Sequence, residues 1–387
     1  MPKILRIINR FNIGGPTYNA TFLTSELKDE FETLLVGGLP EKGEADSLHI
    51  PKEYGVTPML ITELKRTPSF KNDRAAYRKL IEIIREFKPD IVHTHASKAG
   101  ALGRKAAKKC GVPIIVHTFH GHVFHSYFNK LKSHLVQFIE RRLSKITTAI
   151  VTISNQQKQE ICFDYGICPE EKTYVVPLGF DLTKFKRSAE MRLAKQLELG
   201  LNNTIPTIAI IGRLVPIKNH SFFIKVIERI SALSDSHFTV LIVGDGTERK
   251  NIENQIQHLA LKPGQSIRLI GWEKDIASFN NCVDIICLSS DNEGTPVSLI
   301  EAQAGSIPVI STNVGGVQDI LLDGETGFII EKGNLEDYAE KLLDLINDEK
   351  KRLKMSQNGW NFVQQKFSKE TLASNMSILY HKLLNNK

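Results

Sequence analysis

Short apolar runs rich in β-branched residues alternate with longer amphipathic segments along most of the 387-residue chain. Strands separated by helices in this way are typical of parallel sheets that helices cover on both faces. The candidate strands lie at 4–8, 33–36, 91–93, 114–116, 149–153 and 173–176, and again at 207–211, 239–243, 267–270, 285–288, 309–310 and 328–330. The pattern predicts two similar open α/β sheets.

The segment from Pro177 to Phe185 interrupts this alternation, so we place the join between the two sheets near residue 181. A chain of this length suits two domains of roughly 180 residues each. In open α/β sheets ligands bind beyond the carboxyl ends of the strands. The loops that follow those ends are therefore the places to look for chemistry.

The net charge of +7 is unevenly distributed, because residues 1–185 carry 27 Lys and Arg against 19 Asp and Glu. An anionic membrane, a lipid diphosphate or a nucleic acid would prefer this half. Nucleic acid is the weakest of these partners, since no recognised binding motif is present. Five cysteines without a C-x-x-C pair favour a reducing cytoplasm. No apolar run approaches the roughly 18 residues of a membrane span.

Gly14 and Gly15 follow the first strand and precede a helical segment. Glycines at such a turn let the backbone approach a ligand, and the helix N-terminus beyond favours an anion. A tight turn without a ligand explains the two residues equally well. The segment lacks the G-x-G-x-x-G pattern, so a dinucleotide fingerprint is not indicated.

Arg213 follows the first strand of the second half, and Lys218 lies five residues on, where we expect a helix to start. A guanidinium fork and an ammonium beside a helix N-terminus form a natural clamp for a diphosphate. Taken alone, however, the two residues are better explained as solvated surface cations.

The segment from Ser289 to Glu301 is the most informative part of the chain. It follows an apolar strand, and Pro296 is placed to open a helix whose first-turn N–H groups, from Thr295 to Ser298, would point at an anion. Glu293 precedes that helix and Glu301 lies inside it, and a carboxylate can accept both hydroxyls of a vicinal diol. A helix cap and a solvated glutamate are the alternative.

With its intervening residues, the Glu293…Glu301 pair resembles the E-x7-E motif of retaining glycosyltransferases of the GT-B fold, most closely family 4. The resemblance extends over nearly the whole chain. It rests on Gly14-Gly15, 118–122, 177–181, Gly212-Arg213, Lys218-Asn219, 244–246, 305–310 and Gly315-Gly316. The chain departs from the family at Asp319, where relatives often carry Glu.

The resemblance implies a role for each matching residue. Glu301 would hold the donor ribose, Glu293 the transferred sugar, and Arg213 and Lys218 the diphosphate. His120 matches an active-site histidine of the N-terminal domain. The remaining matches contribute backbone or contact the base: Gly14, Gly15, Gly271, Trp272, Gly294, Thr295, Pro296, Val297 and Ser298.

The resemblance also implies an architecture and a reaction. Two Rossmann-like domains face each other across a cleft: an acceptor domain over 1–181 and a donor domain over 182–366, with a helix over 367–387 that returns to the first domain. The enzyme would move a hexose from a nucleotide sugar, expected to be a UDP-sugar, to a glycan or lipid-linked acceptor with retention. We expect it to act in the cytoplasm on a bacterial surface polysaccharide.

A histidine-rich stretch invites a metal-site interpretation. His93, His95, His117, His120, His122 and His125 occur without a cysteine or carboxylate at ligand spacing. The chain also lacks the D-x-D pair with which many glycosyltransferases hold Mg²⁺ or Mn²⁺. We therefore expect metal-independent catalysis and no cofactor, and His93 and His95 are interpreted as strand-end polar residues.

Two cationic helical segments, 98–109 and 126–145, lie in the basic half. In the second, apolar and basic residues alternate; its apolar members are Phe128, Leu131, Leu135, Phe138, Ile139 and Leu143. The periodicity favours a core-facing stripe with a solvated back, whereas the charge asymmetry favours peripheral contact with an anionic membrane.

Two other functional classes stay open. A glycan phosphorylase or an epimerase could share the fold, although we find no context for a pyridoxal-phosphate lysine. A non-catalytic nucleotide-sugar-binding subunit would bind donor without turnover, and the presence of all four residues Arg213, Lys218, Glu293 and Glu301 argues against it.

Overall fold

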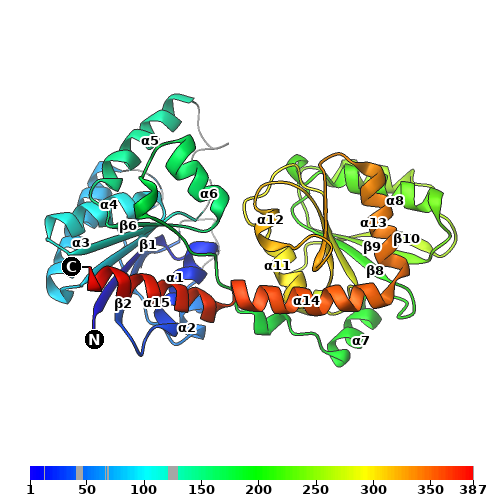
Figure 1. Ribbon diagram of the computed structural model, residues 1–387, viewed down its shortest axis with the longest axis horizontal. Coiled ribbons are helices and arrows are strands. Elements are labelled where there is room, and N and C mark those ends of the chain that lie inside the picture. Colours follow the sequence, from blue (N-terminus) through cyan, green and yellow to red (C-terminus); the bar gives the residue numbers. More distant parts are fainter. Residues whose placement is uncertain (13, 41–46, 66, 68, 121–129, 387) are drawn as a thin grey trace. The chain divides into compact units, whose positions relative to one another are not determined.

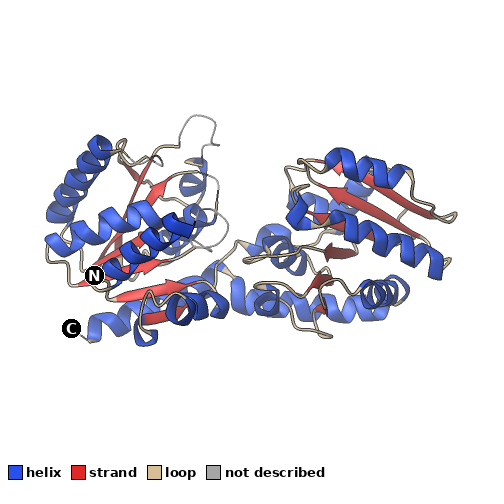
Figure 2. Ribbon diagram, turned by 90° about the horizontal axis from the view of Figure 1, so that it is seen from above, coloured by secondary structure: helices blue, strands red, loops and turns tan. Residues whose placement is uncertain are grey.

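The computed structural model describes residues 1–12, 14–40, 47–65, 67, 69–120 and 130–386. The chain divides into two compact units. Unit 1 comprises Met1–Phe180 with Phe367–Lys387, and unit 2 comprises Asp181–Lys366. In each, helices flank both faces of a parallel sheet (Figures 1 and 2). The two α/β sheets predicted from the alternation are confirmed.

The sheet of unit 1 has seven strands in the order β3-β2-β1-β4-β5-β6-β7. These are β1 (Lys3–Arg10), β2 (Glu32–Gly38), β3 (Met59–Leu60), β4 (Ile91–His95), β5 (Ile114–Thr118), β6 (Ala149–Thr152) and β7 (Thr173–Val175). Strand β3 escaped prediction because its two residues are exposed and carry no apolar periodicity. The order reverses between β1 and β4, so loops after these strands open at the switch point of the sheet.

Helices cover both faces of this sheet. They are α1 (Gly15–Glu26), α2 (His49–Glu53), α3 (Phe70–Phe87), α4 (Ser97–Lys109), α5 (Lys130–Ser144), α6 (Asn155–Gln159) and α15 (Lys369–Asn385). Successive strand residues point to opposite faces. Ile4 therefore joins the core under α1 and α15, and Leu5 joins the core under α3 and α4.

Helix α15 is the expected C-terminal helix that returns to the first sheet. Its Lys369 Nζ lies 2.6 Å from Glu26 Oε1 on α1, and Tyr380 is buried in the sheet core. The hydroxyl of Tyr380 accepts a hydrogen bond of 2.9 Å from the buried guanidinium of Arg6 on β1. The end of the chain is thus part of the fold of unit 1.

The sheet of unit 2 has six strands in the order β10-β9-β8-β11-β12-β13. They are β8 (Thr207–Ile211), β9 (Phe238–Val243), β10 (Gln265–Gly271), β11 (Ile285–Leu288), β12 (Val309–Thr312) and β13 (Gly327–Ile330). The helices are α7 (Ala189–Glu198), α8 (His220–Leu233), α9 (Arg249–Gln257), α10 (Ile276–Asn280), α11 (Val297–Ala304), α12 (Val317–Ile320), α13 (Leu335–Asn347) and α14 (Glu349–Phe367). The order reverses between β8 and β11.

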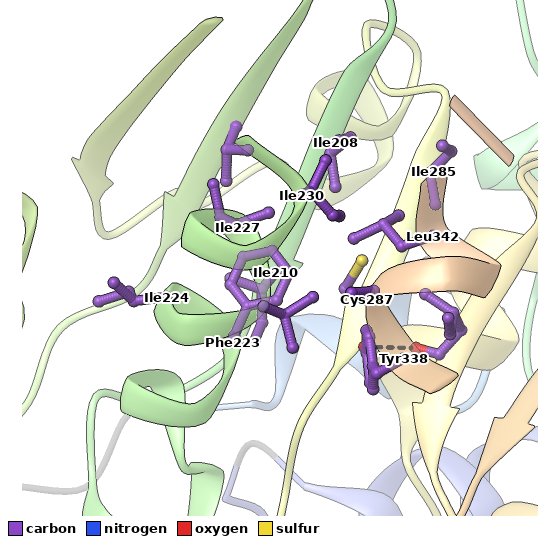
Figure 3. Packing of buried hydrophobic residues seen from close by; sticks show 14 of the residues in the cluster. Ile208, Ile210, Phe223, Ile224, Ile227, Ile230, Ile285, Cys287, Tyr338 and Leu342 are labelled. Atoms are coloured by element: carbon purple, nitrogen blue, oxygen red, sulfur yellow. Dashed lines mark hydrogen bonds between the residues drawn. The ribbon is translucent and has the colours of Figure 1, made fainter. Parts of the chain in front are cut away.

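The core of unit 2 lies between this sheet and helices α8 and α13 (Figure 3). Aliphatic side chains of β8 and β11 fill it together with Phe223 of α8 and Tyr338 of α13. The hydroxyl of Tyr338 donates to the carbonyls of Leu288 and Ile310, each at 3.2 Å. These bonds satisfy a buried polar group and hold α13 over β11 and β12.

Helix α5 does not place its apolar stripe in the core as the periodicity had favoured. Leu135, Phe138 and Ile139 are 58%, 49% and 39% exposed. The cause is a buried ion pair: Arg104 of α4 donates to Glu140 Oε2 at 2.7 Å, and neither side chain is more than 3% exposed. Because Glu140 must face inward to neutralise Arg104, the opposite side of the helix turns outward.

Leu143 of the same predicted stripe is buried, and Phe128 lies outside the described residues. Over the part of the chain that the structure describes, no helix combines the length and apolarity needed to cross a membrane.

Candidate active site

The loops that follow β8 and β11 open at the same edge of the sheet, because these strands pair in parallel with Ile210 opposite Cys287. This edge is the switch point of unit 2, where open α/β sheets bind ligands. The loop after β8 carries Arg213 and Lys218, and the loop after β11 carries Glu293. The segments that follow these two neighbouring strands therefore carry all four residues that the sequence predicted to bind a donor, namely Arg213, Lys218, Glu293 and Glu301.

Lys218 and Glu293 are in direct contact. Lys218 Nζ lies 2.5 Å from Glu293 Oε1, and the side chains are only 21% and 10% exposed. Ser290 Oγ donates to the same carboxylate oxygen at 2.6 Å. Among the described residues, Oε2 of Glu293 accepts no side-chain hydrogen bond. The carboxylate is thus held by one oxygen and has the other available for a ligand.

Lys218 does not start a helix as expected. It ends the 3-10 turn Pro216–Lys218, and α8 begins at His220 with Asn219 as its cap. Asn219 adopts a left-handed backbone with φ of 46°, and its Oδ1 accepts from the N–H of Phe222 at 3.3 Å. Ser289 Oγ donates to the carbonyls of Lys218 and Asn219, both at 3.0 Å. These bonds fix the turn against the end of β11.

Arg213 is exposed, and in the described part of the chain its guanidinium has no protein partner. Its neighbour Gly212 lies under the Lys218 side chain, since a Cβ there would sit 3.7 Å from Lys218 Cδ. Gly244 at the end of β9 has φ of 143°, and a Cβ there would lie 1.9 Å from the carbonyl oxygen of Gly212. The glycine at 244 is therefore required for the loop after β8 to pass.

Helix α11 begins at Val297 with Pro296 at its cap, one residue later than expected. The N–H groups of Thr295, Val297 and Ser298 make no hydrogen bond within the described residues. Gly294 is exposed beside them. Unpaired N–H groups at a helix start carry partial positive charge and suit an anion.

Glu301 lies one turn inside α11 and is partly buried. Its carboxyl has no partner among the described residues, and burial raises its pKa to about 7. Partial loss of water without a protein partner makes the ionised form of such a carboxyl costly in a ligand-free protein. Its position near the switch point makes it a candidate for binding ligand hydroxyls.

The loop that carries Glu293 rests on Gly315 and Gly316. The N–H of Gly316 donates to the carbonyls of Glu293 at 3.3 Å and Gly294 at 3.1 Å. Gly315 has φ of 53°, and a Cβ there would lie 1.7 Å from the carbonyl oxygen of Glu293. Only glycine permits this close approach.

Gly271 and Trp272 stand at the end of β10, two strands from β8. Gly271 has φ of 85° and accepts from the N–H of Gly244 at 2.7 Å. Trp272 is 67% exposed, so its indole offers a free aromatic face at the same edge of the sheet.

In unit 1, Gly14 and Gly15 stand at the start of α1, after β1. A Cβ at Gly15 would meet nothing within 4 Å, and one at Gly14 would have its nearest neighbours at 3.9 Å. Packing within the protein therefore does not require glycine at either position. Close approach of a ligand to the backbone is the explanation for the two glycines that is still open.

His120 follows β5, which pairs with β4. Its Nε2 lies 2.8 Å from Nδ1 of His95, the last residue of β4, and the two rings stack with centroids 5.0 Å apart. Burial lowers the pKa of His120 to about 4. The sequence predicted His95 only as a strand-end polar residue and not as a partner of His120. The available signal was that His95 and His120 each follow closely after a predicted strand, at 91–93 and 114–116.

His93 and His117 are buried and make hydrogen bonds with threonines at 2.7 and 2.8 Å. His93 therefore lies inside β4 and not at its end, whereas His95 is the last residue of that strand as predicted. His122 and His125 lie outside the described residues. In the chain segments that are described, no group of three or more His, Cys, Asp or Glu is arranged to hold a metal ion.

The chain matches known proteins in both halves. Residues 192–362 match the model of the glycosyl transferases group 1, and residues 27–184 match that of Glycosyltransferase Family 4. Over 336 residues the chain is 31% identical to UDP-Gal:alpha-D-GlcNAc-diphosphoundecaprenol alpha-1,3-galactosyltransferase of Escherichia coli, covering 86% of this chain and 85% of that protein. The chain belongs to glycosyltransferase family 4.

Other matches agree with this membership. The glycosyltransferase is 29% identical over 337 residues to the capsular polysaccharide biosynthesis glycosyltransferase CapM of Staphylococcus aureus, which covers 86% of this chain and 87% of that one. The crystal structure of Anabaena HepE in complex with UDP shares the fold, with a TM-score of 0.79 at 20% identity over 98% of this chain and 100% of that one. The GT-B fold expected from the motif is confirmed.

The structure joins some of the predicted residues and not others. In this family 4 glycosyltransferase, Lys218 and Glu293 are bonded to each other. Arg213 and Glu301 belong to the same unit but bond to neither. Gly14, Gly15 and His120 belong to unit 1.

Proposed function

We propose that this glycosyltransferase transfers a hexose from a UDP-sugar to a hydroxyl of a lipid-linked glycan acceptor, with retention at the anomeric carbon and without a metal ion. The reaction would serve the synthesis of a bacterial surface polysaccharide in the cytoplasm, at the inner face of the membrane. The observation that carries the proposal is the Lys218–Glu293 pair at the switch point of unit 2.

The donor diphosphate is proposed to bind at this switch point. Arg213 has no protein partner in the described part of the chain, and the N–H groups at the start of α11 are equally unpaired. Two cations and a helix N-terminus together can offset the charge of a departing nucleoside diphosphate. This inventory supports catalysis without a metal.

Donor binding would exchange the partner of Lys218, from the Glu293 carboxylate to the diphosphate. A diphosphate is a stronger partner for an ammonium than one shared carboxylate oxygen. Lys218 would turn to the diphosphate, and Glu293 would then accept hydrogen bonds from hydroxyls of the transferred sugar. Ser290 keeps the carboxylate in place while the partner changes.

Glu301 is proposed to accept the two ribose hydroxyls of the donor. Its partly buried carboxyl, which has no partner among the described residues, would gain hydrogen bonds that it lacks in the free protein. Trp272 is proposed to contact the base. Neither Glu293 nor Glu301 is proposed as a covalent nucleophile. The acceptor hydroxyl would therefore attack the anomeric carbon from the same face that the diphosphate leaves.

Relatives support the choice of donor and acceptor class. The Escherichia coli relative is named for UDP-Gal and for an acceptor linked to diphosphoundecaprenol. The Staphylococcus aureus relative is named for capsular polysaccharide biosynthesis. We infer a UDP-sugar donor and a polyprenyl-diphosphate-linked acceptor for this chain.

The outward face of α5 is proposed to contact an anionic membrane, where such an acceptor resides. Leu135, Phe138 and Ile139 form an exposed apolar patch, and Arg141 and Arg142 are exposed next to it. An amphipathic helix with cations beside an apolar face binds at the lipid interface.

A thermal-shift screen tests the donor site directly. UDP-galactose, UDP-glucose, UDP-N-acetylglucosamine and GDP-mannose would be compared, because a ligand at 100 times its Kd stabilises the folded state by about 2.7 kcal/mol. If none of these nucleotide sugars stabilises the protein, the proposal is overturned. Stabilisation without sugar transfer to a synthetic polyprenyl-diphosphate N-acetylglucosamine would favour the non-catalytic alternative.

The same transfer assay tests metal independence. With EDTA present the rate is expected to stay within about twofold of the untreated enzyme, since the leaving group is stabilised by protein cations and N–H groups. Loss of transfer that Mn²⁺ restores would refute this part of the proposal.

A further inference from the structure

Lys195 of α7 is a nearly buried cation whose partner stands next to Trp272 in the chain. Its Nζ lies 3.1 Å from Glu273 Oε2 in the loop after β10, although the two residues are 78 positions apart in the sequence. Their side chains are only 8% and 17% exposed. The ammonium also lies 2.9 Å from the carboxylate of Glu198 on the same helix, and that carboxylate is 62% exposed. Glu273 is therefore the inner partner of Lys195.

Both members of this pair are charged near pH 7. Burial acts against each charge, yet hydrogen bonding outweighs it, so the pKa of Lys195 is raised and the pKa of Glu273 is lowered. A desolvated ion pair adds little net stability, and its best-attested role is to fix the register of the segments that it joins. Here it joins helix α7 to the loop that carries Trp272.

The backbone of Trp272 is held on both sides. Before it, the carbonyl of Gly271 accepts a hydrogen bond of 2.7 Å from the N–H of Gly244, which follows β9. After it, Oε1 of Glu273 accepts from the N–H of Asp275 at 2.9 Å, and Asp275 is the N-cap of α10. The indole itself is 67% exposed. The loop thus fixes the backbone of an aromatic residue and presents its ring to solvent.

We propose that Lys195 is a positioning residue, which holds Glu273 and thereby sets the ring of Trp272 as a preformed platform for the nucleotide base. This inference rests on the proposed function for the contact between Trp272 and the base. A ring that is held before binding loses less freedom when a planar base stacks on it. Because the base lies far from the bond that breaks, the pair should affect donor affinity and leave the rate of sugar transfer unchanged.

The motion of the ring can be measured without any ligand, because the chain has only two tryptophans, Trp272 and Trp360. In a Trp360→Phe background of the full chain, time-resolved fluorescence anisotropy reports the Trp272 indole alone. Lys195→Met replaces the ammonium with an apolar group and should raise the amplitude of the fast decay about twofold, since the ring then moves on the nanosecond timescale. Lys195→Arg keeps the charge and should resemble the parent. An unchanged decay in Lys195→Met would overturn the proposal.

Arg192→Met is the matched control. Arg192 lies one turn before Lys195 on α7 and forms an ion pair with Asp284 at 2.9 Å, with side chains 25% and 16% exposed. That pair joins α7 to the residue before β11 and not to the loop of Trp272, so its loss should leave the anisotropy decay unchanged. Equal freeing of the ring in Arg192→Met and Lys195→Met would contradict the positioning role.

Glu273→Gln breaks the same ion pair from the side of the loop. Its amide oxygen can still accept from the N–H of Asp275, so the turn keeps one of its bonds. The ring of Trp272 should be freed as it is in Lys195→Met. This variant also decides the question if Lys195→Met does not fold, and an anisotropy decay like that of the parent would then count against the proposal.

UDP binding gives the functional readout. A base stacked on the indole should quench the fluorescence of Trp272, and Lys195→Met should raise the Kd for UDP about tenfold, or about 1.4 kcal/mol. Arg192→Met should change it less than about twofold. In transfer from UDP-galactose, Lys195→Met should raise the donor KM about tenfold and leave kcat within about twofold of the parent.

The outcomes separate this inference from the proposed function. An unchanged donor KM together with a lowered kcat in Lys195→Met would refute the positioning of the base. If UDP binds without quenching Trp272, the proposed contact between this ring and the base fails. The anisotropy measurement uses no ligand, so it still decides whether Lys195 positions the ring.

Discussion

Lys218 and Glu293 are 75 residues apart in sequence, yet the ammonium of one lies 2.5 Å from the carboxylate of the other. The contact exists because β8 and β11 are neighbours in the sheet. In the free protein each group neutralises the other. On the proposed function the donor diphosphate would replace Glu293 as the partner of Lys218, so one charged hydrogen bond would be exchanged for another.

Removal of either partner should weaken transfer more than it weakens folding. Lys218→Ala and Glu293→Gln are each expected to lower kcat/KM at least roughly tenfold, which corresponds to about 1.4 kcal/mol of barrier. Lys332→Ala is the matched control, since Lys332 pairs with Asp291 in the same loop at 3.0 Å and is 55% exposed. Steady-state kinetics that show full activity in Lys218→Ala or Glu293→Gln would remove these assignments.

Donor affinity should rise with pH through the pKa of Glu301. The carboxyl has a pKa of about 7 in the free protein, and the ribose hydroxyls require its ionised form as acceptor. Between pH 6 and pH 8 the Kd for UDP-glucose should fall roughly tenfold, because the ionised fraction grows by that factor. Calorimetry in buffers of different ionisation enthalpy would detect the released proton.

Glu301→Gln is the control for this titration. It should bind UDP-glucose more weakly and with an affinity that is independent of pH. The Glu301 carboxyl affects the stability of the free protein in the direction opposite to its effect on donor affinity. Its pKa is higher in the folded than in the unfolded state, so it stabilises the fold at low pH. That contribution is lost as pH rises from about 4.5 to about 7. Glu301→Gln should therefore raise the Tm of the free protein at pH 8.

Gly315 should be indispensable for the position of Glu293. Gly315→Ala places a methyl group against the carbonyl of Glu293, at a position only 1.7 Å away, and should lower kcat/KM at least tenfold. Gly324→Ala is matched, because Gly324 has φ of 72° and open space around it. Both variants should lose about 1 kcal/mol of folding free energy from left-handed strain. Equal activity of the two variants would contradict the steric account.

The outward face of α5 should bind vesicles that contain phosphatidylglycerol. Replacing Leu135, Phe138 and Ile139 with serine should abolish sedimentation with these vesicles. Replacing Arg141 and Arg142 with glutamine should weaken binding roughly 30-fold, since each cation contributes about 1 kcal/mol near an anionic surface.

Leu193 and Leu197 supply the control for membrane binding, because they are 53% and 72% exposed on α7 in unit 2. Their replacement with serine should leave vesicle binding unchanged. If it reduces binding as much as the changes in α5 do, the contact is not specific to α5.

The sequence by itself determined the two α/β sheets, the position of nearly every strand and the loops that carry Arg213, Lys218 and Glu293. These features are encoded locally, in the period of the apolar residues and in the glycines and prolines of the turns. The family motif added a function for the same loops.

Only the tertiary structure decided which of these side chains meet. The Lys218–Glu293 bond and the His95–His120 bond depend on which strands become neighbours, and a local pattern carries no such information. The outward turn of the α5 stripe depends on Arg104, a residue of another helix whose buried charge requires Glu140 to face it. The pKa of Glu301 likewise depends on the depth at which α11 packs. Burial and pairing are properties of the assembled chain, because desolvation acts on a group only after distant segments have closed around it.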